Sequence, residues 1–206
     1  MSEGDFFSDE AKRASAASVR SVEAQTSAEV VVAVRKRSGQ YGVLAYHFGA
    51  GVAALVVAYL LVAPEVYGVG AIALDGLLAF ALGAVLAANF DTLRRLLSRS
   101  STLSQNVNSA ARAAFFDLGI SRTSGRNGIL VYVSLFERRC VVLTDIGIDP
   151  AQLEPSWHST KGALEQAVKG RDWSAFRQAL ESLGPVLGRV HPRSDDDVNE
   201  LSDEVQ

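Results

Sequence analysis

Two long apolar runs, at residues 42–63 and 68–88, constrain the fold of this chain more than any other feature. Each run is long enough to cross the roughly 30 Å hydrocarbon core of a bilayer as a helix, and only residues 64–67 separate them. The alternative is a buried helical pair in a water-soluble core. The rest of a 206-residue chain is too small to wrap two such helices, so we predict a transmembrane helical hairpin over residues 42–88.

Basic residues flank the outer ends of the two runs. They are Arg35, Lys36 and Arg37 before the first run and Arg94, Arg95 and Arg99 after the second, whereas the connecting turn carries only Glu65. The positive-inside rule then places both termini in the cytoplasm and the turn outside. Residues 1–20 lack the apolar core of a cleaved signal peptide, so the first run is expected to act as its own signal. We therefore predict an inner (cytoplasmic) membrane protein with two spans.

The overall charge narrows the class of partner. A formal net charge of −3 leaves no broad basic surface for non-specific nucleic-acid binding, so we expect no nucleic-acid partner. The expected partners are the lipid bilayer, a membrane protein, or further copies of the chain.

Cys140 is the single cysteine and cannot form an intrachain disulfide. Its strand-like setting predicts a buried, reduced thiol, in agreement with a cytoplasmic domain.

Outside the hairpin, the pattern predicts one α/β domain in two parts, at residues 1–38 and 94–190, followed by an acidic tail at 191–206 that we expect to be disordered. Strands are expected at 29–34, 129–135 and 140–146. The first strand reaches the second through a long crossover that contains helix, which favours a parallel pair. The turn at 136–139 predicts an antiparallel pair for the second and third strands.

Helices are expected on both sides of these strands. Ser8 is a candidate N-cap for a helix that continues to about residue 25, and amphipathic patterns predict helices at 103–118, 159–168 and 172–190. Pro185 should kink or divide the last of these. The membrane hairpin is then an insertion in the crossover between the first two strands.

Three phrases carry a resemblance to a known family. They are FFSDE at residues 6–10, TSAEVVV at 26–32, and RNGILVYVSLFERR at 126–139, and in this order they resemble the TPM domain family of thylakoid and bacterial membrane-tethered proteins. The resemblance covers most of the chain outside the hairpin and the tail. It implies a small α/β/α sandwich with a mixed sheet, to which the hairpin is added. It also implies links to acid phosphatase activity, to calcium binding and to the assistance of larger membrane complexes.

The chain departs from that pattern in ways that matter for activity. It has no Asp-x-Asp nucleophile phrase, no Cys followed at the fifth position by Arg, and no Gly-rich phosphate loop before a helix. Its spans also lie inside the domain, whereas many relatives carry a single terminal anchor.

A first candidate polar site combines Glu29, Arg126 and Asn127. Glu29 opens the first strand, and the other two lead into the second. Because the starts of parallel neighbours lie at the same sheet edge, a carboxylate, a guanidinium and an amide are expected to meet there. The arrangement is either a small polar pocket or a structural ion pair that fixes the strand ends.

A second candidate is a calcium loop at Asp145 and Asp149, which flank Gly147. Hard cations prefer several oxygen ligands, and glycine permits a sharp turn. Two carboxylates are too few for such a site without oxygens from elsewhere, so a structural turn is the alternative.

Within the apolar runs, Asp75 and His47 are the costly polar residues, and intramembrane acids are functional candidates by default. In a simple hairpin they do not lie at the same depth, so a direct pair is not expected. Two ridges of small residues, Ala45-Gly49-Ala53 and Ala79-Gly83-Ala87, predict close helix packing. They either join the two spans or dock another membrane protein.

Two main functions follow from these features. The first is a cytoplasm-facing, membrane-anchored accessory protein that binds or stabilises a membrane protein complex. The second is a metal-assisted phosphatase or related hydrolase, which the family resemblance implies together with calcium. Transport that uses Asp75 is a third, which needs oligomerisation because two helices cannot enclose a pore.

Overall fold

The structure is a computed structural model that describes residues 8–193 and 200–201. The chain forms two compact units. We name residues 1–38 and 104–206 the main unit and residues 39–103 the hairpin unit. The hairpin unit therefore interrupts the main unit in sequence.

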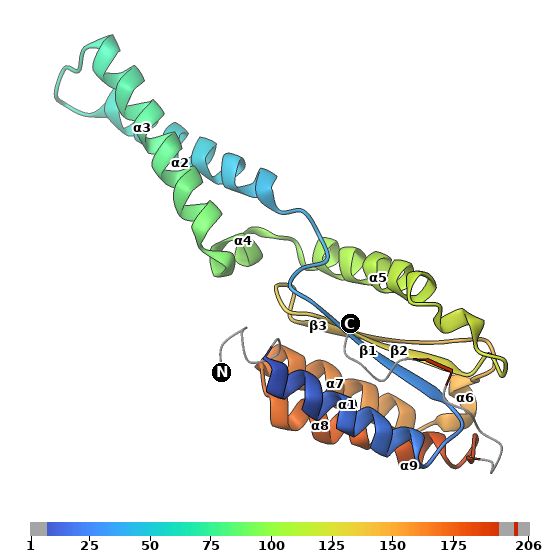
Figure 1. The fold of residues 1–206 in the computed structure, drawn as a ribbon. Coiled ribbons are helices and arrows are strands. Elements are labelled where there is room, and N and C mark those ends of the chain that lie inside the picture. The colour runs from blue at the N-terminus through green and yellow to red at the C-terminus, as the bar shows by residue number, and fades with distance from the viewer. Residues whose placement is uncertain (1–7, 194–199, 202–206) are drawn as a thin grey trace. The chain divides into compact units, whose positions relative to one another are not determined.

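A mixed three-stranded sheet forms the centre of the main unit (Figure 1). Its strands are β1 (Glu29–Arg35), β2 (Gly128–Ser134) and β3 (Arg139–Thr144), in the order β1-β2-β3. β1 pairs with β2 in parallel, and β2 pairs with β3 antiparallel. The predicted strands, their pairing and the α/β class are thus confirmed.

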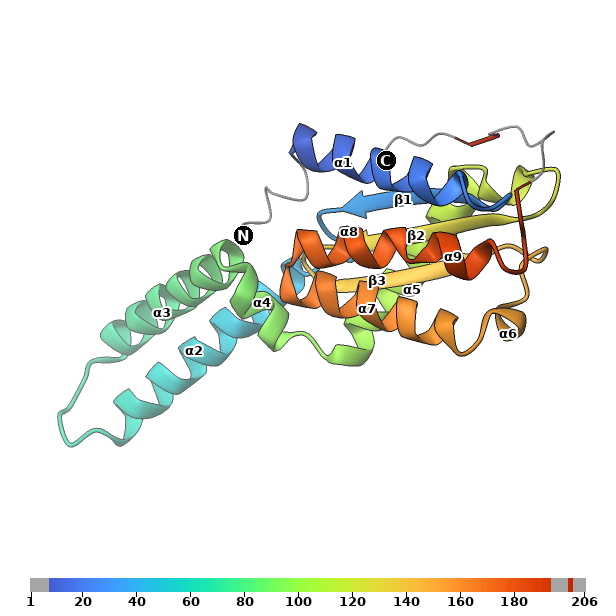
Figure 2. The same ribbon diagram turned by 90° about the horizontal axis from the view of Figure 1, so that it is seen from below.

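Helices cover both faces of this sheet (Figures 1 and 2). One face carries α1 (Asp9–Glu23), α7 (Ser156–Gly170), α8 (Trp173–Glu181) and α9 (Leu183–Leu187), and the other carries α5 (Ser100–Asp117). Short elements join them: α6 (Pro150–Leu153) and the 3-10 helix η2 (Ile120–Arg122). The main unit is therefore an α/β/α arrangement.

Side-chain alternation along β2 explains why this strand is almost wholly apolar. Ile129, Val131 and Val133 contribute to the core beneath α1, α7, α8 and α9, whereas Leu130 and Tyr132 belong to the core beneath α5. All five are at most 2% exposed. A strand covered on both faces loses the alternation of a half-exposed strand.

Local capping and one proline set the helix ends. Ser8 Oγ accepts a hydrogen bond from Ala11 N at 3.1 Å, and Asp172 Oδ1 accepts one from Ala175 N at 2.9 Å. The expected helix at 172–190 is divided into α8 and α9, with α8 ending at Glu181. Pro185 has no N–H for the carbonyl group of Glu181, and its ring crowds that carbonyl, which accounts for the division.

The expected disorder from residue 191 onward is wrong for the first residues of the tail. The carbonyl oxygen of His191 accepts hydrogen bonds from Ser27 N at 3.0 Å and from Thr26 Oγ1 at 2.7 Å, and Pro192 forms a β-bridge with Thr26. These contacts fix the chain against the start of β1. The acidic residues 195–197 and 203–204 lie outside the described residues.

The hairpin unit contains α2 (Gly42–Val62), α3 (Val69–Asn89) and the short α4 (Asp91–Leu97). The first two are long and apolar enough to cross a membrane. A Cβ atom on Gly49 would lie 2.6 Å from the carbonyl oxygen of Phe80, and one on Gly83 would lie 3.0 Å from Gly49 Cα. The small-residue ridges therefore join α2 to α3, as the first of the two interpretations predicted.

Candidate functional site

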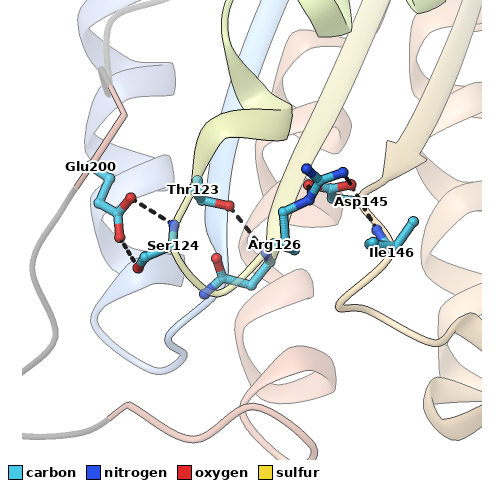
Figure 3. Close-up of polar contacts among 7 residues, drawn as sticks. Thr123, Ser124, Arg126, Asp145, Ile146 and Glu200 are labelled. Carbon is cyan, nitrogen blue, oxygen red and sulfur yellow. Dashed lines mark hydrogen bonds and ion pairs between the residues drawn. The ribbon is translucent and has the colours of Figure 1, made fainter.

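Arg126 and Asp145 form a two-point ion pair in the main unit (Figure 3). Arg126 Nε lies 2.8 Å from Asp145 Oδ2, and Arg126 Nη2 donates to Asp145 Oδ1 at 3.1 Å. The carboxylate also accepts a hydrogen bond from Ile146 N at 2.8 Å. The Asp145 side chain is only 4% exposed, whereas that of Arg126 is 47% exposed. A two-point charged contact of this kind fixes geometry at the end of β3.

The backbone around this ion pair is held in an uncommon conformation. Arg126 has φ 51°, in the left-handed region that residues other than glycine rarely adopt. Its N–H donates to Thr123 O at 3.1 Å, and its carbonyl oxygen accepts from Gly147 N at 2.9 Å. A Cβ atom on Gly147 would lie 2.5 Å from Gly125 O and 2.6 Å from Arg126 O. The turn after β3 thus packs directly on the loop before β2, and only glycine fits there.

The three residues of the first candidate site are brought to one sheet edge but are not joined as expected. Glu29 is 5% exposed, and its N–H donates to Asn127 O at 3.2 Å. Asn127 Nδ2 donates to Ser27 O. Among the described residues, the guanidinium of Arg126 pairs with Asp145 and not with Glu29. The sequence analysis did not predict this ion pair, because Asp145 directly follows β3, whereas the prediction considered only the ends of β1 and β2.

Asp149 has a capping role and does not face the same point as Asp145. Asp149 Oδ1 accepts from Ala151 N at 3.0 Å as the N-cap of α6, and Oδ2 accepts from Gln152 Nε2 at 3.3 Å. Within residues 8–193 and 200–201, no group of three or more His, Cys, Asp or Glu side chains is arranged to hold a metal ion. The calcium loop remains a prediction from the Asp145-Gly147-Asp149 pattern, and the metal-assisted phosphatase remains a prediction from the resemblance.

A carboxylate from the C-terminal segment binds the same loop on its other side (Figure 3). Glu200 Oε2 accepts from Ser124 N at 2.9 Å, and Glu200 Oε1 accepts from Ser124 Oγ. The hydrogen bonds from the Ser124 side chain and backbone lower the pKa of Glu200. Thr123 Oγ1 supports the loop from within by accepting from Asn127 N at 3.2 Å. Only the acidic composition of the tail could have suggested this contact from sequence.

A second polar cluster, which the sequence analysis missed, lies at the opposite end of β1 and β2. Ser38 Oγ lies 3.0 Å from Tyr132 Oη and 2.7 Å from Ser134 Oγ, and Ser38 N donates to Glu137 Oε1 at 2.8 Å. Ser134 Oγ donates to Glu137 Oε2 at 2.5 Å. Glu137 is 4% exposed, and Ser134 is fully buried. The signal available in the sequence was a serine at the end of the second strand and a glutamate within the tight turn that follows it.

This second cluster anchors the last residue of the main unit before the hairpin unit. Ser38 is that residue, and its backbone and side chain both contact the cluster. The backbone nearby is also fixed, because Leu135 N donates to Arg35 O at 3.0 Å and Phe136 N to Lys36 O at 2.9 Å. The contacts hold the point at which the chain leaves the sheet. These hydrogen bonds fix the backbone of the segment that follows β1.

In the hairpin unit, Asp75 and His47 lie at different levels. Asp75 precedes Gly76, and a Cβ atom on Gly76 would lie 2.9 Å from Val57 Cγ2, so Asp75 is level with that part of α2. His47 is ten residues earlier on α2, about 15 Å away at 1.5 Å per residue. Both side chains are exposed in the described structure. The two residues therefore lie at different depths of the hairpin, as expected from their positions in the sequence.

Cys140 is a partly buried residue that packs against the core. β3 is an edge strand, and the residue as a whole is partly exposed, while its side chain packs against the core beneath α7. Burial raises the pKa of the Cys140 thiol, and the nearby carboxylate of Glu165 raises it further. The thiol is therefore a poor nucleophile, in line with the buried cysteine that the sequence predicts.

Comparison with known proteins finds one solved structure of similar fold. No protein-family model matches the sequence, and no curated protein matches it. The structure is similar to the NMR structure of the BA42 protein from the psychrophilic bacterium Bizionia argentinensis, with a TM-score of 0.57 and 18% sequence identity. The match covers 96% of this chain and 92% of BA42. At this identity the similarity describes the architecture alone.

Proposed function

We propose that this protein is a membrane-anchored, cytoplasm-facing accessory protein whose TPM-like main unit binds or stabilises a membrane protein complex. The observation that carries the proposal is the surface of the hairpin unit. In each of its two long helices, only 11% of the most apolar 18-residue window is buried. Large apolar side chains face outward, among them Leu55 at 73%, Leu61 at 66% and Leu77 at 65% exposed. Such a surface needs a bilayer or a membrane partner around it.

The orientation follows from the charges at the helix ends. Arg94 and Arg95 lie in the last turn of α4, directly after the second long helix, and the loop between the helices carries Glu65 alone. The positive-inside rule favours the cytoplasm for the arginine-bearing end. Both parts of the main unit connect to the hairpin unit through this end, so the main unit lies in the cytoplasm under this proposal.

Asp75 is the residue that we assign to partner binding inside the membrane. It is exposed on α3, and its neighbour Gly76 packs against α2. A carboxyl group that faces lipid is costly, and the cost falls when it hydrogen-bonds to a polar group of another helix. The small-residue ridges are occupied between α2 and α3, so a partner is expected at the outer face that carries Asp75.

The experiment is chemical crosslinking of native membranes, followed by mass spectrometry of the full chain. We expect one membrane protein to be recovered reproducibly, with a strong loss of that crosslink in Asp75→Leu and a smaller loss in Asp75→Asn. Leu77→Ala is the matched control, because Leu77 is exposed on the same helix but lies about 200° around it from Asp75, and this variant should retain the crosslink. Recovery of monomer alone from all membranes would contradict the proposal.

A further inference from the structure

We propose that an anionic phospholipid binds in a groove between α2 and α4, with one acyl chain in the groove and its phosphate beside the arginines of α4. The inference rests on the membrane insertion proposed above. It adds a ligand of defined chemistry to a part of the hairpin unit that the partner-binding face does not include.

The groove is an apolar channel of about 710 Å³ within the hairpin unit. α2 supplies one wall through Leu44, Phe48, Val52 and Leu55, and Leu97 of α4 supplies part of the other. From Leu44 to Leu55 the wall extends about 16 Å along the helix, at 1.5 Å per residue. An elongated, apolar site of this length suits an extended hydrocarbon chain better than a compact ligand.

The charges at the α4 end favour an anionic headgroup. Residues 91–99 contain Arg94, Arg95 and Arg99 against a single acid, Asp91. Asp91 forms its ion pair with Arg94, so the positive charge of the segment exceeds what this acid neutralises. Basic groups at the cytoplasmic end of membrane helices attract anionic lipid headgroups.

The position of α4, directly after the membrane-spanning helix α3, places these arginines at the depth expected for a lipid phosphate. α4 follows α3 with one intervening residue, and Leu96 is 81% exposed beside the arginines. Exposed leucine next to arginine is typical of a helix at the boundary between acyl chains and headgroups. His47 lines the groove near this end and offers ring nitrogens to the glycerol ester region.

Two alanines allow a matched test of the groove. Ala54 lines it, whereas Ala81 of α3 is outside its lining, and both are exposed on apolar helices. Ala54→Phe should fill the channel, and Ala81→Phe adds the same bulk elsewhere. The full chain is reconstituted in nanodiscs of phosphatidylcholine doped with phosphatidylglycerol, and the lipid retained after transfer to detergent is measured by native mass spectrometry.

We expect the unmodified chain and Ala81→Phe to retain one phosphatidylglycerol in preference to phosphatidylcholine, and Ala54→Phe to lose it. Arg95→Gln should reduce the preference by about fivefold, the usual effect of one basic residue near an anionic surface. Equal retention in Ala54→Phe and Ala81→Phe, or no preference between the lipids, would overturn the inference. Alkaline extraction separates the two proposals. A chain that alkali removes from membranes overturns both, whereas an inserted chain without bound lipid overturns only the groove.

Discussion

The strands of the main unit and the helices of the hairpin unit are similarly apolar, yet they place their large side chains in opposite ways. In β2, every residue from Gly128 to Ser134 is buried. In α2, by contrast, the buried residues are Ala45 and Gly49, and in α3 they are Gly76, Gly83 and Ala87. The sheet of the main unit buries large side chains, whereas α2 and α3 bury only small residues.

This difference is the one expected if water surrounds the main unit and, as proposed above, a membrane surrounds the hairpin unit. Water drives large apolar side chains into a core, as it has done around β1 and β2. Between membrane helices that driving force is weak, so backbones approach through small residues and large side chains face lipid. Apolar composition alone does not distinguish a water-soluble core from a pair of membrane helices. The size of the residues at the packing contact distinguishes them.

The largest expected effect comes from the same substitution made in both regions. Leu130→Ala removes a fully buried side chain from β2 and should lower the free energy of unfolding by about 2–5 kcal/mol. Leu77→Ala removes a side chain that is 65% exposed and should change it by less than about 0.5 kcal/mol. Denaturant unfolding in mild detergent, followed by the fluorescence of Trp157 and Trp173, measures the main unit. Retention in alkali-washed membranes measures the hairpin unit, and a clear loss of retention in Leu77→Ala would break the comparison.

A smaller effect is expected from adding one methyl group at the contact between α2 and α3. Gly49→Ala places a Cβ 2.6 Å from Phe80 O and 3.0 Å from Ala84 N, both backbone atoms that cannot move aside easily. We expect a loss of about 1–3 kcal/mol in the stability of the hairpin unit. Thermal unfolding of the helices in detergent, followed by far-UV circular dichroism, checks it.

Gly51→Ala is the matched control for that prediction. Gly51 lies two residues further along α2, and a Cβ there would meet nothing within 4 Å. Alanine should therefore leave the packing intact and favour the helix slightly. Equal destabilisation by the two substitutions would show that the small-residue contact does not hold the hairpin together.

Much of the fold was predictable because its patterns are local or strongly constrained by topology. The apolar runs gave the hairpin, the β-branched runs gave the strands, and the length of the connection between β1 and β2 indicated a parallel pair. Helix ends were less accurate. α7 begins at Ser156, three residues before the expected start, and α5 begins at Ser100. Helix termini depend on caps and contacts that periodicity does not encode.

The polar sites were less predictable, because partners distant in sequence decide them. The sequence placed Glu29, Arg126 and Asn127 at one edge correctly, but the choice of Asp145 as the partner of Arg126 depends on how the turn after β3 packs. The glycine at position 147 is needed for this packing, but its role becomes clear only from its contact with Gly125 and Arg126 in the structure. The cluster of Ser38 with Glu137 likewise joins residues 99 positions apart.

The smallest expected effect lies in the polar surface of the main unit, where contacts respond to pH far more than the core does. The Ser124 hydrogen bonds lower the pKa of Glu200 from its usual value of 4.5, so they favour the carboxylate form. The contact should therefore be fully formed above that value and lost as the pH falls through the lowered pKa. Hydrogen exchange of the Ser124 amide should be slow at neutral pH, and its protection should fall progressively as the pH drops below 4.5, after correction for intrinsic rates.

Glu200→Ala should remove that protection at neutral pH, while the amides of β2 remain protected because they belong to the sheet. Since Glu200 is fully exposed, its loss should leave the unfolding transition of the main unit in place. Protection of Ser124 that is unchanged in Glu200→Ala would show that the loop holds its conformation without the C-terminal segment. The Arg126 contact with Asp145 and the turn at Gly147 would then be sufficient to shape this edge of the sheet.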